Sequence, residues 1–108
     1  ERAASAAGEA RPDAAGPAAL RRQQKERRRA EERATRQLAR VEARIAEREQ
    51  ALAALAWRRA DPEVLRDGER ARALDAEQAA LRAEIEVLYA EWEGWAAALA
   101  EAAPGGSA

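Results

Sequence analysis

The chain has 108 residues, of which 36% are charged, and its formal net charge is −1. It contains no Cys and no His, which removes disulfides, thiolate metal sites and the commonest general base and metal ligand. No apolar stretch approaches the roughly 20 residues of a membrane span. We therefore expect no catalytic residue, metal site, cofactor or membrane partner, and so no enzyme activity in this chain.

The first 16 residues combine Ala with Gly and Pro and show no apolar periodicity, which is typical of a flexible linker. Pro17 follows, and proline is favoured at the first position of a helix because its missing N–H has no helical partner there. Ala, Arg, Glu and Leu dominate the middle of the chain, a composition typical of long helices and coiled coils.

One interruption divides this middle part of the sequence. Pro62 should end the helix that precedes it, and Asp61 is a favourable N-cap for a short turn. Asp67 offers a second N-cap, for the next helix. The predicted organisation is a disordered linker over 1–16, a hairpin domain over 17–103 with helices over about 17–59 and 68–102, and a disordered tail over 104–108.

Apolar residues recur at alternating steps of three and four along both predicted helices, in positions that we call the seam. The seam positions of the first helix are Leu38, Val41, Ile45, Arg48, Leu52 and Leu55. Those of the second helix are Ala71, Leu74, Gln78, Leu81, Ile85, Leu88, Trp92, Trp95 and Leu99. This spacing is typical of a coiled coil, and a short loop makes neighbouring helices antiparallel. The fold prediction is therefore all-α, a two-helix antiparallel coiled-coil hairpin.

The seam also predicts a register between the helices. If Val41 lies opposite Ile85, the apolar layers match and the two polar seam residues, Arg48 and Gln78, face each other. The other predicted pairs are Leu55 with Ala71, Leu52 with Leu74, Ile45 with Leu81, Leu38 with Leu88, and Ala34 with Trp92.

Beyond Ala34 the seam of the first helix becomes polar. We therefore expect the far end of the hairpin to be its least stable part. Trp92 and Trp95 lie on the seam and suit core packing, but Trp95 could instead stack on a base or dock a neighbouring domain. Trp57 lies near the loop, where it either packs at the tip or contacts RNA.

The near-zero net charge hides a strong segregation. Residues 20–44 carry ten basic and four acidic side chains, whereas residues 60–103 carry four basic and eleven acidic ones. Basic residues at steps of three and four gather along one side of a helix, and guanidinium groups suit phosphate backbones. The alternative is an ordinary solvated helix face. The candidate nucleic-acid-binding residues are Arg21, Arg22, Lys25, Arg28, Arg29, Arg33, Arg36 and Arg40.

Three segments resemble the C-terminal coiled-coil domain of ABC-F ATPases of the Uup type. They are Leu38-Ala-Arg-Val-Glu-Ala-Arg-Ile45, Asp61-Pro-Glu-Val-Leu-Arg-Asp67, and the segment from Leu81 that ends Leu88-Tyr-Ala-Glu-Trp-Glu93. The similarity extends over about residues 21–100. The resemblance implies a cytoplasmic parent protein with two ATP-binding cassettes, which would bind ATP and Mg²⁺ outside this chain. It also implies DNA or ribosomal RNA as the partner of the hairpin.

Two other functions stay open at this point. The chain could be a structural or protein-interaction coiled coil, acting as a spacer or as a weak homodimer. It could also be a tRNA-contacting arm similar to that of seryl-tRNA synthetase, which would prefer tRNA to duplex DNA. Charge reversal in the basic segment should abolish binding for a nucleic-acid-binding domain and leave a spacer unaffected.

Overall fold

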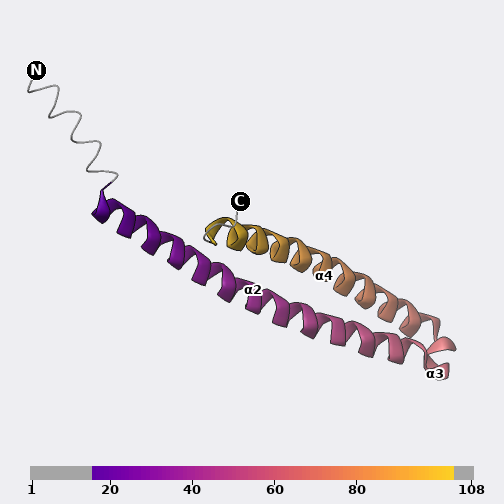
Figure 1. Ribbon diagram of the computed structural model, residues 1–108. Helices are drawn as coiled ribbons and strands as arrows, with labels where there is room; N and C mark the ends of the chain where they lie inside the picture. Colours follow the sequence, from indigo (N-terminus) through magenta and orange to yellow (C-terminus); the bar gives the residue numbers. More distant parts are fainter. Residues whose placement is uncertain (1–15, 104–108) are drawn as a thin grey trace, which may run out of the picture.

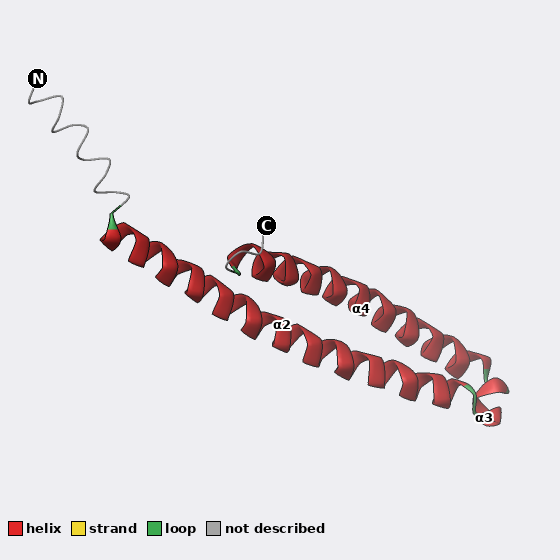
Figure 2. Cartoon of the chain, in the orientation of Figure 1, coloured by secondary structure: helices red, strands yellow, loops and turns green. Residues whose placement is uncertain are grey.

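The computed structural model describes residues 16–103, which form three helices (Figure 1, Figure 2). They are α2 (Pro17–Arg59), α3 (Pro62–Leu65) and α4 (Gly68–Ala102). The all-α prediction is confirmed, since residues 16–103 contain no strand. The two-helix description is incomplete, because α3 forms a third, short helix between the long ones. Nearly all of the predicted linker and the whole of the predicted tail lie outside the described residues.

Local signals set the ends of the helices. Pro17 occupies the first turn of α2, and the backbone turns away before Pro62, which begins α3. The Asp61 carboxylate accepts a hydrogen bond from the Glu63 N–H at 2.9 Å and so caps α3. The Asp67 carboxylate caps α4 in the same way, accepting from the Arg70 N–H at 3.2 Å. Each of these bonds satisfies a backbone donor that the first turn of a helix leaves without a partner.

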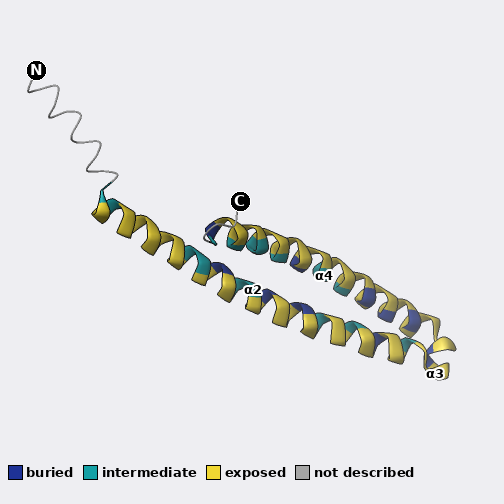
Figure 3. Ribbon diagram, viewed as in Figure 1, coloured by how far each residue is buried: buried dark blue, intermediate teal, exposed yellow. Residues whose placement is uncertain are grey.

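The two long helices pack side by side and run antiparallel (Figure 1). Every predicted seam position is buried or half-buried, and Figure 3 shows these positions recurring along the helices. One buried cluster contains Val41, Ile45 and Leu88, with Trp92 and Trp95 packed against it. The core-packing interpretation of both tryptophans is therefore confirmed.

The predicted register is wrong by one heptad. Val41 was expected opposite Ile85, but it shares a cluster with Leu88 and has Trp92, seven residues beyond Ile85, packed against that cluster. A hydrogen bond at 2.9 Å from the Trp92 indole N–H to the Glu42 carboxylate fixes the same alignment. The predicted pairing of Arg48 with Gln78 is not formed. Arg48 instead donates to Glu84 at 2.7 Å.

The short helix α3 explains the shift. Val64 is only 2% exposed and lies in a second cluster with Leu55, Ala71 and Leu74. The first turn of α4 therefore packs partly on α3, so the end of α2 pairs further along α4. Arg59, the last residue of α2, donates to Asp75 at 2.8 Å, beyond the first turn of α4.

At the other end, α2 extends past the C-terminal end of α4 (Figure 1). Ala102, in the last turn of α4, is buried, and on α2 Ala34 is the first buried position. Residues 20–29 of α2 are all exposed. We call residues 17–29 the overhang, a stretch of about 20 Å at 1.5 Å per residue.

Candidate nucleic-acid interface

All eight candidate residues lie on α2, and all eight are exposed. Their helix is held rigidly from Ala34 onward by the packing against α4, while the overhang stands free. Helix geometry therefore decides which of the eight side chains a single ligand could contact at once.

Six of the candidates form a row along the side of α2 that faces away from α4. Successive helical residues turn by about 100°, so a residue two positions from a buried one points roughly to the opposite side. Arg36 stands two positions from buried Ala34, and Arg40 stands two positions from the seam residue Leu38. The members of this row, which we call the basic row, are Arg22, Lys25, Arg29, Arg33, Arg36 and Arg40. It is about 27 Å long.

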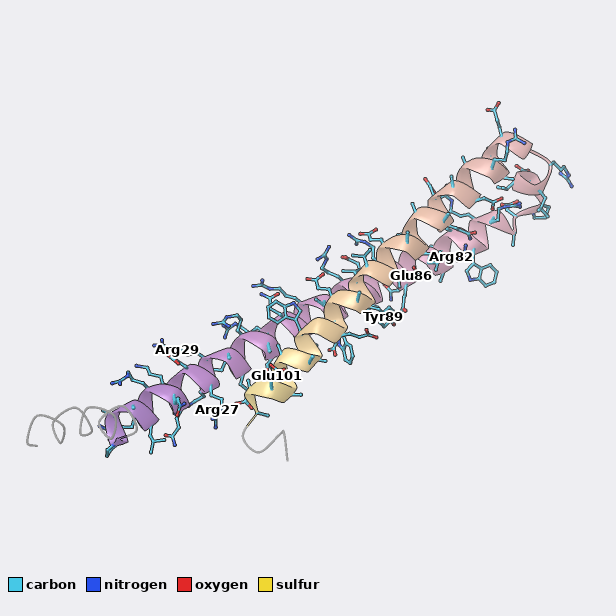
Figure 4. All side chains as sticks on the ribbon, turned by 90° about the horizontal axis from the view of Figure 1, so that it is seen from above. Arg27, Arg29, Arg82, Glu86, Tyr89 and Glu101 are labelled. Atoms are coloured by element: carbon cyan, nitrogen blue, oxygen red, sulfur yellow. The ribbon has the colours of Figure 1, made fainter. Side chains whose placement is uncertain are left out.

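Arg21 and Arg28 are not in the row. They lie at its edge, about a quarter of a turn further round the helix. Arg27 points to yet another side, and Figure 4 shows Arg27 and Arg29 leaving α2 on different sides.

No member of the basic row forms an ion pair within residues 16–103. The arginines of that range that do form ion pairs are Arg48 and Arg59. The hydrogen bond to Glu84 raises the pKa of Arg48, and the hydrogen bond to Asp75 raises the pKa of Arg59. Both of these arginines hold the helices together, whereas the guanidinium groups of the row are free to bind an anion.

The row weakens its own helix. Like charges three or four residues apart repel each other, by about 0.2–0.5 kcal/mol a pair. The overhang also lacks tertiary packing, so no contact with α4 offsets this repulsion. A bound polyanion would remove the repulsion and supply the missing contacts.

Sequence reasoning missed one residue of this surface, Arg27. It continues the seam side of α2 beyond the end of α4, and with Gln24, Arg28 and Glu31 it lines a shallow hollow of about 280 Å³. The overhang carries six basic side chains and one acidic one, Glu26. Its positive charge therefore extends from the row round to the seam side of the helix and is not confined to the row. The heptad pattern alone could not reveal this, because it does not say where α4 ends relative to α2.

The opposite flank of the pair is acidic and aromatic. The Tyr89 hydroxyl donates to Glu49 at 3.0 Å, and this bond raises the pKa of Tyr89. Together with Glu42 and Trp92 these side chains line a groove in which both carboxylates already accept hydrogen bonds. This flank would repel a negatively charged ligand, whereas the basic row and the overhang carry an excess of exposed cations.

Within residues 16–103, no cluster of side chains suits a metal ion. No helix in that range has the length and apolar character needed to cross a membrane.

The chain matches no curated protein and no solved structure significantly. It does match one protein family, described as the ABC transporter C-terminal domain, over residues 21–94. The matched range takes in the basic row from Arg22 onward, all of α3 and most of α4. Because the match covers more than half of its length, the chain belongs to the ABC transporter C-terminal domain family.

Proposed function

We propose that the chain is the nucleic-acid-binding accessory domain of a cytoplasmic ABC-F ATPase of the Uup type. Membership of the ABC transporter C-terminal domain family supports a role as an accessory domain of an ABC protein. The observation that carries the nucleic-acid part is the basic row, six exposed cations on one side of α2 that form no ion pair with any residue of 16–103.

The ligand is the phosphate backbone of DNA or ribosomal RNA. Guanidinium groups bind phosphate oxygens through two parallel hydrogen bonds, and such contacts carry no sequence information. Steps of three and four residues bring successive cations about 5–6 Å apart along α2. Binding is therefore non-specific and weakens as salt rises.

In this proposal the domain performs no chemistry of its own. The α2–α4 packing holds the C-terminal part of the row, Arg36 and Arg40, in place, and the row anchors the parent protein to nucleic acid. ATP and Mg²⁺ are handled by the ATP-binding cassettes of the parent chain.

The experiment compares two charge reversals of equal size. One variant combines Arg29→Glu, Arg33→Glu and Arg36→Glu, all within the basic row. The matched control combines Arg70→Glu, Arg72→Glu and Arg82→Glu, three exposed arginines of α4. Both variants change the net charge equally, so a purely global electrostatic effect would weaken binding in both.

We expect the row variant to lose at least about tenfold in affinity for duplex DNA or structured RNA at moderate salt, measured by fluorescence anisotropy. The α4 control should stay within a few-fold of the unmodified chain. Equal losses in both variants, or none in either, would contradict a binding face on α2 and favour a spacer or protein-docking role.

A further inference from the structure

Trp57 is the most exposed large apolar side chain in the part of the chain that the structure describes. It lies in the last turn of α2 and is 81% exposed, whereas Trp92 and Trp95 pack against the core. Neither buried cluster contains Trp57. The fold therefore does not need this indole, which would gain free energy by leaving water.

The surroundings of Trp57 favour a nucleic acid over a basic peptide. Arg58, the next residue, is exposed and forms no ion pair within residues 16–103, in contrast to Arg59, which is bound to Asp75. On α3, Leu65 is 61% exposed and the Arg66 that follows is also exposed. The tip thus presents an exposed indole with the Arg58 guanidinium on the next residue, and exposed carboxylates at Asp61 and Glu63. An aromatic ring and a guanidinium are the groups that stack on bases and bind phosphates in single-strand sites.

Arg58 also lies in line with the basic row, and Trp57 lies about a quarter of a turn from that line. From Arg40, steps of four, three, four, three and four residues lead to Arg58, so Arg58 continues the row on the same side of α2. The distance from Arg40 to Trp57 along the helix is about 25 Å. These steps pass Arg44, Glu47, Ala51 and Ala54, so a strand whose phosphates follow the row has to cross Glu47 and two alanines before it reaches Arg58 and the neighbouring indole.

We propose that Trp57 stacks on an unpaired nucleobase at the tip of α2, and so gives the domain a preference for nucleic acid with a single-stranded segment. This inference rests on the proposed function, since it assumes that the row binds phosphates. The bases of a duplex are stacked on one another and offer no free face, whereas bases in single strands, loops and bulges do. Phosphate contacts then supply most of the affinity, and the indole supplies the preference.

The test measures the affinity of the whole chain for an oligothymidylate and for a fully paired duplex of equal length. The variants are Trp57→Ala, Trp57→Phe, which keeps an aromatic face, and Val87→Ala as the control. Val87 is 67% exposed and lies on α4, away from the tip. Far-UV circular dichroism establishes that each variant remains helical, as expected for exposed positions.

We expect Trp57→Ala to weaken oligothymidylate binding by about 5- to 100-fold and to leave duplex binding within twofold. Trp57→Phe should retain most of the affinity, and Val87→Ala all of it. The salt dependence of Trp57→Ala should match that of the unmodified chain, because no phosphate contact is lost.

Three results would overturn the inference. If the unmodified chain binds the duplex, and Trp57→Ala binds oligothymidylate as tightly as the unmodified chain does, stacking is wrong while the proposed function stands. The same holds if Trp57→Ala lowers the affinity for both ligands by the same factor. If the unmodified chain binds neither ligand at low salt, the proposed function fails and the stacking inference fails with it.

Discussion

Leu88 and Val87 are neighbours in the sequence with opposite roles in the fold. Leu88 is 2% exposed and packs with Val41 and Ile45, whereas the side chain of Val87 faces solvent. Truncating Leu88 leaves a cavity in the core, so Leu88→Ala should lower the free energy of unfolding by about 2–4 kcal/mol. Val87→Ala should change it by less than about 0.5 kcal/mol. Urea denaturation followed by circular dichroism measures both, and equal losses would contradict the packing of Leu88.

Asp75 should make the stability of the pair depend on pH. Its hydrogen bond from Arg59 lowers the pKa of the Asp75 carboxyl in the folded state. A lowered pKa means that the stabilisation is present above the ordinary aspartate pKa, about 3.9, and is lost as pH falls through the folded-state value.

We therefore expect Asp75→Asn to lower the melting temperature at pH 7 and to have progressively less effect below about pH 4. Glu77→Gln is the matched control, since Glu77 is exposed and forms no ion pair within residues 16–103. A deficit of Asp75→Asn that is constant from pH 7 to pH 2 would show that the ion pair with Arg59 does not stabilise the fold.

Among the helices, α4 contains a correctable weakness at Gly94. Glycine inside a helix is about 1 kcal/mol less favourable than alanine because its backbone loses more freedom. A Cβ added at Gly94 would meet no other atom within 4 Å. Gly94→Ala should therefore raise the melting temperature by about 4–8 °C in circular dichroism. An unchanged or lower melting temperature would mean that this part of α4 is not helical in solution.

The register between α2 and α4 can be tested because the chain has no cysteine of its own. The structure brings Ile45 into one cluster with Leu88, while the register expected from the sequence would pair Ile45 with Leu81. On mild oxidation, the pair Ile45→Cys/Leu88→Cys should form an intramolecular disulfide much faster than Ile45→Cys/Leu81→Cys. Mass spectrometry over time measures the two rates of disulfide formation. Faster formation by Ile45→Cys/Leu81→Cys would support the register expected from the sequence, one heptad away.

This difference marks what the sequence could and could not predict. Pro62, Asp61 and Asp67 act through their own backbone neighbours, so local rules were enough to predict where helices begin and end. The heptads show which side of each helix is buried, but a slide by seven residues keeps those sides together and only moves Arg48 and Gln78 into different layers. The choice between registers depends on Val64 packing over the start of α4, a tertiary contact that no periodicity reveals.

The same limit applies to the candidate site. The charge pattern placed the cations on one helix, and their exposure follows from the seam. Arg27 is exposed only because α4 ends before it reaches this part of α2, and the point where α4 ends beside α2 depends on the register.

Over the whole molecule, the charge segregation gives a long body with two different flanks. The overhang and the basic row form a positive surface over the first part of α2, while residues 60–103 are strongly acidic. Such a distribution orients the domain toward a polyanion from a distance and keeps the acidic helix away from it. The range of this attraction becomes shorter as the salt concentration rises, because the screening length is about 10 Å at 0.1 M ionic strength.

The most direct test of nucleic-acid binding by this domain is the salt dependence of its affinity for duplex DNA and structured RNA, measured by fluorescence anisotropy. Contacts from the basic row to about four to six phosphates predict a log–log slope of about −3.5 to −5.5. Comparison of the two ligands then identifies the preferred nucleic acid. If neither ligand binds even at low salt, the basic row is an ordinary solvated surface and the domain is a spacer or a protein-docking element.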